Sequence, residues 1–173
     1  FVPPELAALT VPLEGRRLKG WMDRYEHIAA FGFMIQDRGR GRVRYPFGPA
    51  LPALTYHMED DDFALMLKGM RFLAKVFFAA GASRVLLPLN IPDNEFSTPQ
   101  KLEAADLSAR SPAQLQMMAF HPLGTCGMGR VVDGDLRAGP GVYVCDGSVV
   151  PESLGVNPQI AIYAFALRLG DHV

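Results

Sequence analysis

The sequence has 173 residues, a net charge of −1 at pH 7 and 49% hydrophobic residues. With 17 basic against 18 acidic side chains, it has no overall field that would attract nucleic acid or an anionic membrane surface. The composition is globular rather than disordered, and no run approaches the roughly 18 apolar residues of a membrane span. The two cysteines, Cys126 and Cys145, are too few for a disulfide framework, and two free thiols are favoured over a single bridge.

Glycine and proline are both abundant, at 17 and 14 residues, above their ordinary share in globular proteins. This excess predicts a loop-rich fold in which the backbone repeatedly comes close to another group. The first four residues, Phe-Val-Pro-Pro, are an unusual start, and we expect a piece of a larger protein. No secretory signal is visible, which leaves the compartment open and slightly favours the cytoplasm.

In chain order, residues 1–20 are expected to form a proline-anchored entry loop. The apolar run 21–35, a glycine-bearing turn at 37–41 and the alternating residues 42–45 predict a β-hairpin. Residues 46–57 contain three prolines and are predicted to be a linker.

Four arginines, at positions 38, 40, 42 and 44, are spaced by two and would share one face of a strand. Such a stripe could bind phosphate. A solvated edge face that resists aggregation is favoured, because no aromatic residues alternate with the arginines as stacking partners.

The clearest predicted helix follows the acidic residues 59–62, which suit a helix N-terminus. A stripe with steps of three and four predicts its buried face: Phe63, Met66, Met70, Leu73 and Phe77. Gly81 is the expected C-cap. A short strand at 83–87, a loop at 88–98, a helix over 99–110 and a short helix through Met118 complete this part.

The last third is rich in glycine between its predicted strands, at 130–133 and 142–145, and ends in an apolar helix over 158–169. The glycines after His121 have the order G-x-x-G-x-G, which is not a dinucleotide fingerprint, and no phosphate-binding P-loop is present. The histidines and cysteines show no paired metal-ligand spacing, so no metal site is expected. Ser148 lacks the glycine that follows the nucleophile of a hydrolase elbow.

His121 and Asn157 are the two candidate functional side chains of this region. His121 precedes a proline at the mouth of the glycine loop, where it could act as a base near neutral pH. Local features alone favour an ordinary surface or core histidine. Asn157 precedes Pro158 and would be a routine N-cap of the last helix, but the same helix end would also present free N–H groups to a ligand.

Three linked segments, residues 121–129, 142–151 and 155–158, resemble the C-terminal signature of the glucose–methanol–choline (GMC) flavoprotein oxidoreductases. The Gly-Val-Asn-Pro form of the last segment is more similar to the cholesterol oxidases and long-chain alcohol oxidases than to the sugar oxidases. Residues 37–43 and 56–81 resemble the long-chain alcohol oxidase branch more loosely.

The resemblance implies that His121 takes or orients the alcohol proton and that Asn157 holds the substrate oxygen. It also implies that FAD binds along Asp146, Gly147, Asn157, Pro158 and Gln159. The substrate would be a small-molecule alcohol, and a lipophilic alcohol or sterol is expected by family analogy alone.

Two features of the family are missing from this sequence. There is no N-terminal G-x-G-x-x-G Rossmann half, and Glu26 is no clear match for the substrate-side glutamate of sterol oxidases. We therefore expect an α+β fold: residues 1–118 form a substrate-binding portion with an antiparallel sheet and helices, and residues 119–173 complete an FAD-binding domain. The chain alone is expected to be inactive without that N-terminal half. The alternative is a non-catalytic module that binds a ligand or partner and keeps the motif for structural reasons.

Overall fold

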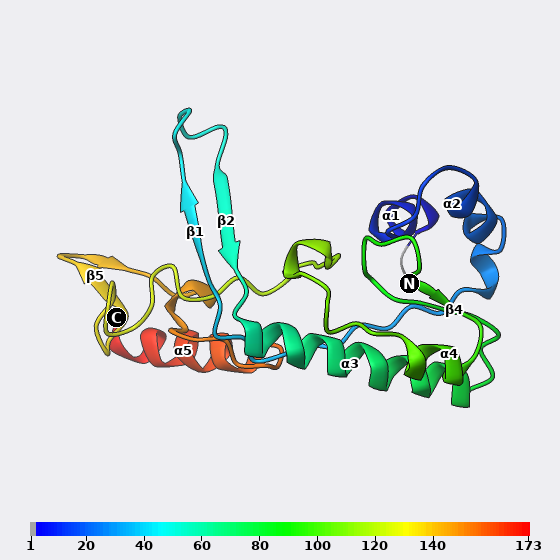
Figure 1. The fold of residues 1–173 in the computed structure, drawn as a ribbon. Coiled ribbons are helices and arrows are strands. Elements are labelled where there is room, and N and C mark those ends of the chain that lie inside the picture. The colour runs from blue at the N-terminus through cyan, green and yellow to red at the C-terminus, as the bar shows by residue number, and fades with distance from the viewer. Residues whose placement is uncertain (1–2) are drawn as a thin grey trace. The chain divides into compact units, whose positions relative to one another are not determined.

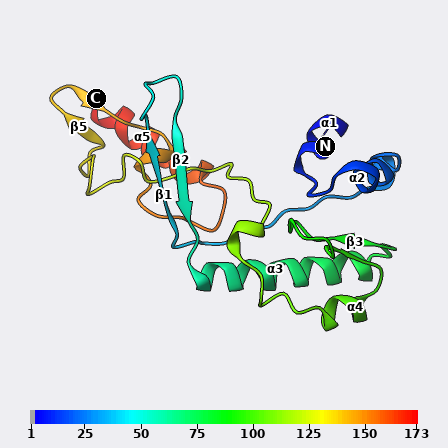
Figure 2. The same ribbon diagram turned by 45° about the horizontal axis from the view of Figure 1, so that its top comes forward.

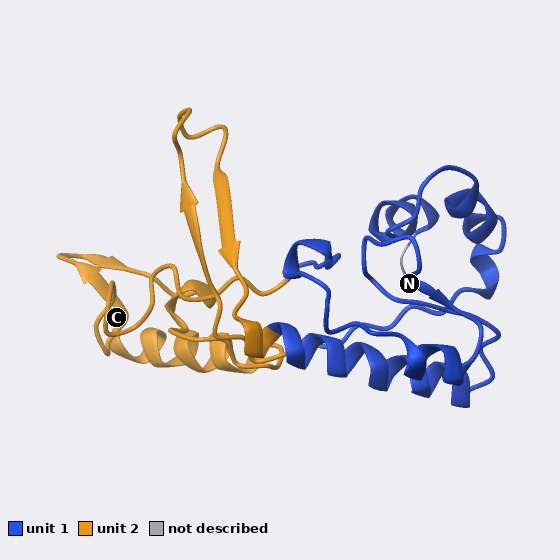
Figure 3. Cartoon of the chain, viewed as in Figure 1, with its two compact units in different colours: residues 1–33, 63–118 blue, residues 34–62, 119–173 orange. Residues whose placement is uncertain are grey.

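The computed structural model describes residues 3–173, which group into two compact units (Figure 3). Unit 1 takes the described residues up to Phe33 together with Phe63–Met118, and unit 2 takes Met34–Asp62 together with Ala119–Val173. Both combine helices with short antiparallel sheets of two strands, which confirms the mixed α+β class. The predicted functional division at residue 118 stays a prediction, and in the structure residues 34–62 group with the C-terminal segment.

Helices replace the entry loop and the apolar strand that we expected at the start of unit 1. Helix α1 covers Pro4–Thr10, α2 covers Gly15–Met22, and a 3-10 turn, η1, covers Tyr25–His27 (Figure 1). Proline suits the first turn of α1, where its missing N–H would have no helical partner. The prediction of a strand from residue 21 onward was wrong, because the apolar residues there continue a helix and then an irregular segment.

Helix α3, Asp60–Ala79, matches the predicted helix closely. Phe63 and Met70 are buried, and the other members of the predicted stripe are half-buried. Gly81 has φ of +94° and terminates the helix as expected. Its N–H donates to the Phe78 carbonyl, while the next N–H, of Ala82, donates to the Phe77 carbonyl, the two bonds of a Schellman motif.

The core of unit 1 forms between α3, a two-stranded sheet and α4 (Figure 2). Strand β3, Val85–Leu86, pairs antiparallel with β4, Glu95–Phe96. Helix α4 covers only Pro99–Ala104, shorter than predicted. Its C-cap residue, Ala105, is extended, and the Arg71 guanidinium donates to the Leu102 and Ala105 carbonyls at this end of the helix.

A capping box between Ser111 and Gln114 opens only a 3-10 turn, η2, at Pro112–Gln114. The helix that we expected to continue to Met118 is replaced by an extended segment. The Gln114 carbonyl accepts from the Asn90 N–H, and the Gln116 N–H donates to the Pro88 carbonyl. Pairing with residues 88–90 therefore prevails over local helix propensity.

Unit 2 contains a β-hairpin whose second strand lies in the predicted linker. Strand β1, Arg40–Arg44, pairs antiparallel with β2, Ala53–His57 (Figure 1). The prolines lie before β2, in the connection, and do not interrupt the ladder. The buried Asp62 carboxylate accepts the backbone N–H groups of Arg38 and Gly39, both at 2.9 Å, which fixes the entry to β1.

The remainder of unit 2 comprises a small sheet and the last helix. Strand β5, Arg137–Gly139, pairs with β6, Val142–Tyr143, and a 3-10 turn, η3, covers Gly147–Val149. The strand predicted at 130–133 is reduced to a single bridge, between Met128 and Val132. Helix α5 covers Gln159–His172, three residues beyond its predicted end.

A second small core holds unit 2 together. Its buried members are Val132, Leu136 and Val149, and both cysteines pack against it as free, half-buried thiols. None of the helices formed by residues 3–173 is long and apolar enough to span a membrane.

Candidate functional site

The three sequence motifs of the last third meet in unit 2. Backbone hydrogen bonds join the glycine loop to η3: the Cys126 N–H donates to the Ser148 carbonyl at 3.0 Å, and the Met128 N–H donates to the Val149 carbonyl at 2.9 Å. The loop that begins at His121 and the Asp-Gly-Ser turn therefore form one connected piece of structure.

Gly147 brings the third motif into the same place. A β-carbon on this residue would lie 3.3 Å from Leu123 Cδ2 and 3.5 Å from Ile162 Cδ1, and 3.6 Å from the Pro122 carbonyl oxygen. The segment just after His121 and the first turns of α5 thus both pack against Gly147. Absence of a side chain at this position lets them approach.

Asp146 caps η3 through its side chain. Its Oδ1 accepts the Ser148 N–H at 2.8 Å. Hydrogen bonding from Ser148, first from its side chain and then from its backbone, holds the pKa of Asp146 below the usual range for an aspartate. The carboxylate is therefore ionised at neutral pH. Asp146 is also exposed, and it precedes Gly147 in the chain.

His121 is exposed, and its side chain makes no hydrogen bond within residues 3–173. The interpretation as a satisfied core histidine does not fit this placement. The exposed imidazole fits an ordinary surface histidine, and it is equally available to a ligand.

Asn157 does not cap helix α5. The N-cap position is taken by Pro158, which is buried, and no side chain within the described residues caps the helix. The predicted N-cap role of Asn157 was therefore wrong, because the helix begins one residue later than expected. The Asn157 side chain is exposed and free for another role.

Gln159, the first residue of α5, is also exposed, and its Nε2 donates to the Tyr163 hydroxyl at 2.7 Å. Because no side chain of residues 3–173 caps the helix, N–H groups of its first turn remain able to donate to a bound group. Exposed amides beside a free helix N-terminus fit a planar cofactor with carbonyl oxygens at its edge.

Several glycines of the motif contact this chain itself. A β-carbon at Gly155 would lie 2.9 Å from Gln36 Cβ, and one at Gly127 would lie 2.9 Å from Arg130 Nη2. Gly129, with φ of +80°, has nothing within 4 Å. The predicted close approach is therefore observed within the chain, and an approach to a flavin stays a prediction.

Sequence reasoning missed Gln36 and Arg130 as neighbours of the motif. Gln36 belongs to the segment before β1, far away in the sequence, and nothing in its surroundings signals the contact. Arg130 follows the glycine loop directly, so only its identity as a long cationic donor could have drawn attention to it.

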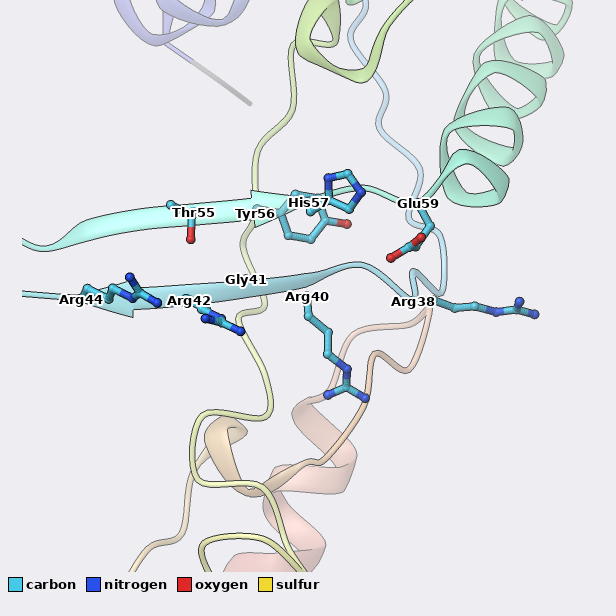
Figure 4. Close-up of a pocket in the computed structure, with 9 residues that line it drawn as sticks. All are labelled: Arg38, Arg40, Gly41, Arg42, Arg44, Thr55, Tyr56, His57 and Glu59. Atoms are coloured by element: carbon cyan, nitrogen blue, oxygen red, sulfur yellow. The ribbon is translucent and has the colours of Figure 1, made fainter.

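The arginine stripe lies apart from these motifs, on the hairpin. In the register of β1 and β2, Arg40 is opposite His57, Arg42 opposite Thr55 and Arg44 opposite Ala53. These arginines therefore share one face, and Figure 4 shows the side chains of Arg40 and Arg42 leaving β1 on the same side. With Tyr56 and Glu59 they line a shallow open groove.

The structure of the hairpin favours a solvated face over a phosphate site. Every residue of β1 is exposed, as a solvated face requires. Tyr56 donates a 2.7 Å hydrogen bond to Asp37 rather than standing free as a stacking platform. Burial and then this bond raise the pKa of the Tyr56 hydroxyl, so it stays neutral. The solvated face remains the better interpretation.

Residues 3–173 hold no group of three histidine, cysteine, aspartate or glutamate side chains that could bind a metal ion.

Comparison with known proteins places these motifs in a family. The family described as GMC oxidoreductase matches residues 37–166. An uncharacterized GMC-type oxidoreductase of Mycobacterium tuberculosis is 35% identical over 176 residues, covering 98% of this chain and 27% of the relative. No solved structure matches the chain significantly.

More distant relatives have named activities. A long-chain-alcohol oxidase of Arabidopsis thaliana is 26% identical over 191 residues, covering 99% of this chain and 24% of the relative. An ecdysone oxidase of Bombyx mori is 28% identical over 157 residues, covering 85% of this chain and 23% of the relative. The chain thus spans about a quarter of the length of these relatives.

Proposed function

The chain belongs to the GMC oxidoreductase family, and from that premise we propose that it is the C-terminal part of an FAD-dependent enzyme that oxidises a CH–OH group to a carbonyl. The observation that carries the proposal is the junction at Gly147. There the segment after His121 packs with the helix that follows Asn157. This packing supports a shared site for His121 and Asn157, the two side chains proposed to act on the alcohol.

The proposed cofactor contacts lie at the start of η3 and at the N-terminus of α5. Asp146 and Gly147 would border the bound FAD, while Asn157, Pro158 and Gln159 would face its ring system at the N-terminus of α5. The uncapped helix end supports this assignment, because free N–H groups and the positive end of the dipole stabilise electron-rich oxygens. When bound, the flavin supplies the acceptor for the hydride that leaves the carbinol carbon.

His121 is the proposed base. A neutral imidazole has one nitrogen that accepts a proton, and the exposed side chain is free to accept it from the substrate hydroxyl. Loss of this proton lets the C–O bond gain double-bond character while the hydride leaves from carbon. The proton then remains on the imidazole until solvent removes it.

Asn157 is the proposed holder of the substrate oxygen. Its amide can donate to that oxygen while His121 accepts the proton, so the two side chains would orient the hydroxyl between them. An amide suits this task because it stays uncharged during the reaction. The structure supports the role by leaving the side chain without a capping function.

The proposed substrate class is a lipophilic alcohol. This rests on the names of relatives, a long-chain-alcohol oxidase and an ecdysone oxidase, at 26% and 28% identity. The chain spans about a quarter of such relatives, and we propose that further parts of the protein complete the pocket that selects the substrate. The N-terminal half with its nucleotide-binding fold is therefore the proposed partner of this sequence.

The proposal is tested by expressing the full-length protein that contains this sequence. We expect a yellow protein with flavin absorbance, and bleaching of that absorbance when short, long or steroid alcohols are added without oxygen. Bound flavin with bleaching by none of the three alcohol classes would contradict the CH–OH assignment. Absence of flavin would instead favour a non-catalytic binding module that keeps the motif as structure.

A further inference from the structure

One arginine of unit 2 links the two segments that lead to the proposed catalytic residues. The Arg130 Nη2 atom donates to the Pro151 carbonyl at 3.0 Å and, over a longer distance of 3.4 Å, to the Gly124 carbonyl. Gly124 lies three residues after His121, and Pro151 lies six residues before Asn157. A guanidinium is suited to this bridge, since its donors diverge from a rigid plane and its charge strengthens both bonds.

The glycine loop is shaped to admit this guanidinium. A β-carbon at Gly127 would lie 2.9 Å from Arg130 Nη2 and 3.3 Å from its Nε. At Gly124, where φ is +81°, it would lie 3.5 Å from Nη2 and 3.2 Å from the Pro151 carbonyl oxygen. Gly124 and Gly127 therefore have a function that the sequence did not reveal: they leave room for the arginine.

The backbone bonds of the loop do not perform the same task. Two of them tie Cys126 and Met128, which follow Gly124 in the chain, to η3, and a third joins the Gly127 N–H to the Gly124 carbonyl at 3.2 Å within the loop itself. Arg130 adds a link at the end of the loop nearest His121. Without it, the residues between His121 and Gly124 would keep the packing of Leu123 against Gly147 but lose their connection to Pro151.

We propose that Arg130 is a positioning residue that fixes the His121 loop relative to the segment ending in Asn157. This inference rests on the proposed function for its catalytic consequence. Arg130 acts through the two carbonyls and not by touching substrate, so its loss should misplace the base while leaving substrate binding nearly intact. Misplacement by about 1 Å can lower a rate by as much as about 100-fold.

The test uses the full-length protein with R130A and R130K, and with R137A as the matched control. Arg137 also donates from its side chain to a carbonyl in unit 2, that of Gly139 at 3.1 Å, but within its own sheet. We expect R130A to lower kcat about tenfold or more with KM changed less than twofold. R130K should recover part of kcat, because an ammonium reaches one carbonyl at a time. R137A should match the wild type.

A second readout does not depend on catalysis. Hydrogen–deuterium exchange in residues 121–128 and in 148–157 should be faster in R130A than in R137A, because the link between these segments is lost. If the full-length protein oxidises no alcohol, the proposed function fails while this measurement still decides whether Arg130 links the two segments. Unchanged exchange in both segments, or a kcat for R130A equal to that of R137A, would overturn the inference.

A double-mutant cycle separates positioning from general destabilisation. G127A should lower kcat in the wild type because the added methyl displaces the guanidinium. In the R130A background only the 3.2 Å approach of the new methyl to the Gly124 carbonyl oxygen remains, so the same change should cost less and the two effects should not add. If R130A does not fold, R130K and G127A are compared instead, and additive effects of these two changes would equally contradict the proposal.

Discussion

Gly147 lies directly against Leu123: a β-carbon on the glycine would stand 3.3 Å from Leu123 Cδ2. The same position would be 3.5 Å from Ile162 Cδ1, in α5. One missing side chain thus sets how closely the His121 loop approaches the last helix. In the proposed enzyme, this spacing would decide whether the base and the substrate-holding amide act on one hydroxyl.

A graded series at Gly147 tests this spacing. Gly147→Ala requires the Leu123 side chain to shift by a few tenths of an ångström. Gly147→Val must push the His121 loop and α5 apart. We expect Gly147→Ala to change stability and activity little. We expect Gly147→Val to lower the free energy of unfolding by about 1–3 kcal/mol and to lower both flavin content and kcat. Melting temperature, flavin-to-protein absorbance ratio and steady-state kinetics are the measurements.

Gly134 is the matched control for that series, because a β-carbon there would meet nothing within 4 Å. Gly134→Val should leave flavin content and kcat unchanged. Equal losses from valine at both positions would mean that the packing at Gly147 has no special place in the site.

His121→Ala in the full-length protein should lower kcat by ~10²-fold or more, the scale of losing a general base. Flavin content and melting temperature should stay close to those of the wild type, because the exposed imidazole makes no hydrogen bond within residues 3–173. His27→Ala, at an exposed histidine of unit 1, is the control. A wild-type kcat in the His121 variant would remove this residue from the mechanism.

Asn157 distinguishes a substrate-holding role from helix capping. If it holds the substrate oxygen, Asn157→Ala should reduce kcat/KM strongly with little change in stability, because Pro158 occupies the N-cap. A capping role would instead cost about 0.5–2 kcal/mol of stability and would be restored by Ser. Thermal unfolding and kinetics of the Ala and Ser variants decide between them; lowered stability in Ala, recovered in Ser, would support capping.

Asp146 gives a pH-dependent prediction. Hydrogen bonding from Ser148 lowers its pKa in the folded protein, so folding favours the ionised form. Its contribution to stability is therefore complete above the unfolded pKa, near 4, and is lost as the pH falls through the lower folded value. Asp146→Asn can still accept the Ser148 N–H but cannot ionise. In urea unfolding, we expect the difference in unfolding free energy between the wild type and Asp146→Asn to become smaller from pH 7 to pH 3. A difference that stays constant with pH would refute this.

The parts of the fold that follow from local sequence were predicted well. Helix α3 has an acidic start, a regular apolar stripe and Gly81 at its end, and each of these signals acts within a few residues. The hairpin was misplaced because its pairing is not local: β1 pairs with β2 across a proline-rich connection that reads as a linker. Prolines exclude a central strand only where they interrupt the ladder.

The candidate site divides in the same way. The motif around His121 and Asn157 can be recognised from the sequence, because each of its three segments is continuous and the segments follow one another along the chain. The contacts of Gly155 with Gln36, and of Gly127 with Arg130, depend on how the chain folds back on itself. A glycine in a sequence signals that something comes close, but the identity of the neighbour is tertiary information.

The isolated chain of 173 residues should retain no flavin and oxidise no alcohol. Helix α5 packs Phe165 and Leu169 on the unit 2 core, while Ile160, Tyr163 and Leu167 of the same helix are 83%, 58% and 73% exposed. Spacings of three and four place these exposed residues along one face. An exposed face of large apolar side chains marks a surface that another part of a protein covers, so we expect the rest of the enzyme to cover this face.

Leu167→Lys and Leu169→Lys together test whether the rest of the enzyme covers the exposed apolar face of α5. In the isolated chain, Leu167→Lys should reduce self-association in light scattering without loss of helix content, whereas Leu169→Lys should unfold unit 2. In the full-length protein, Leu167→Lys should also destabilise, because it would place a charge in a covered interface. If Leu167→Lys were silent in the full-length protein, or if the isolated chain held flavin with turnover, the face would be an ordinary exposed surface.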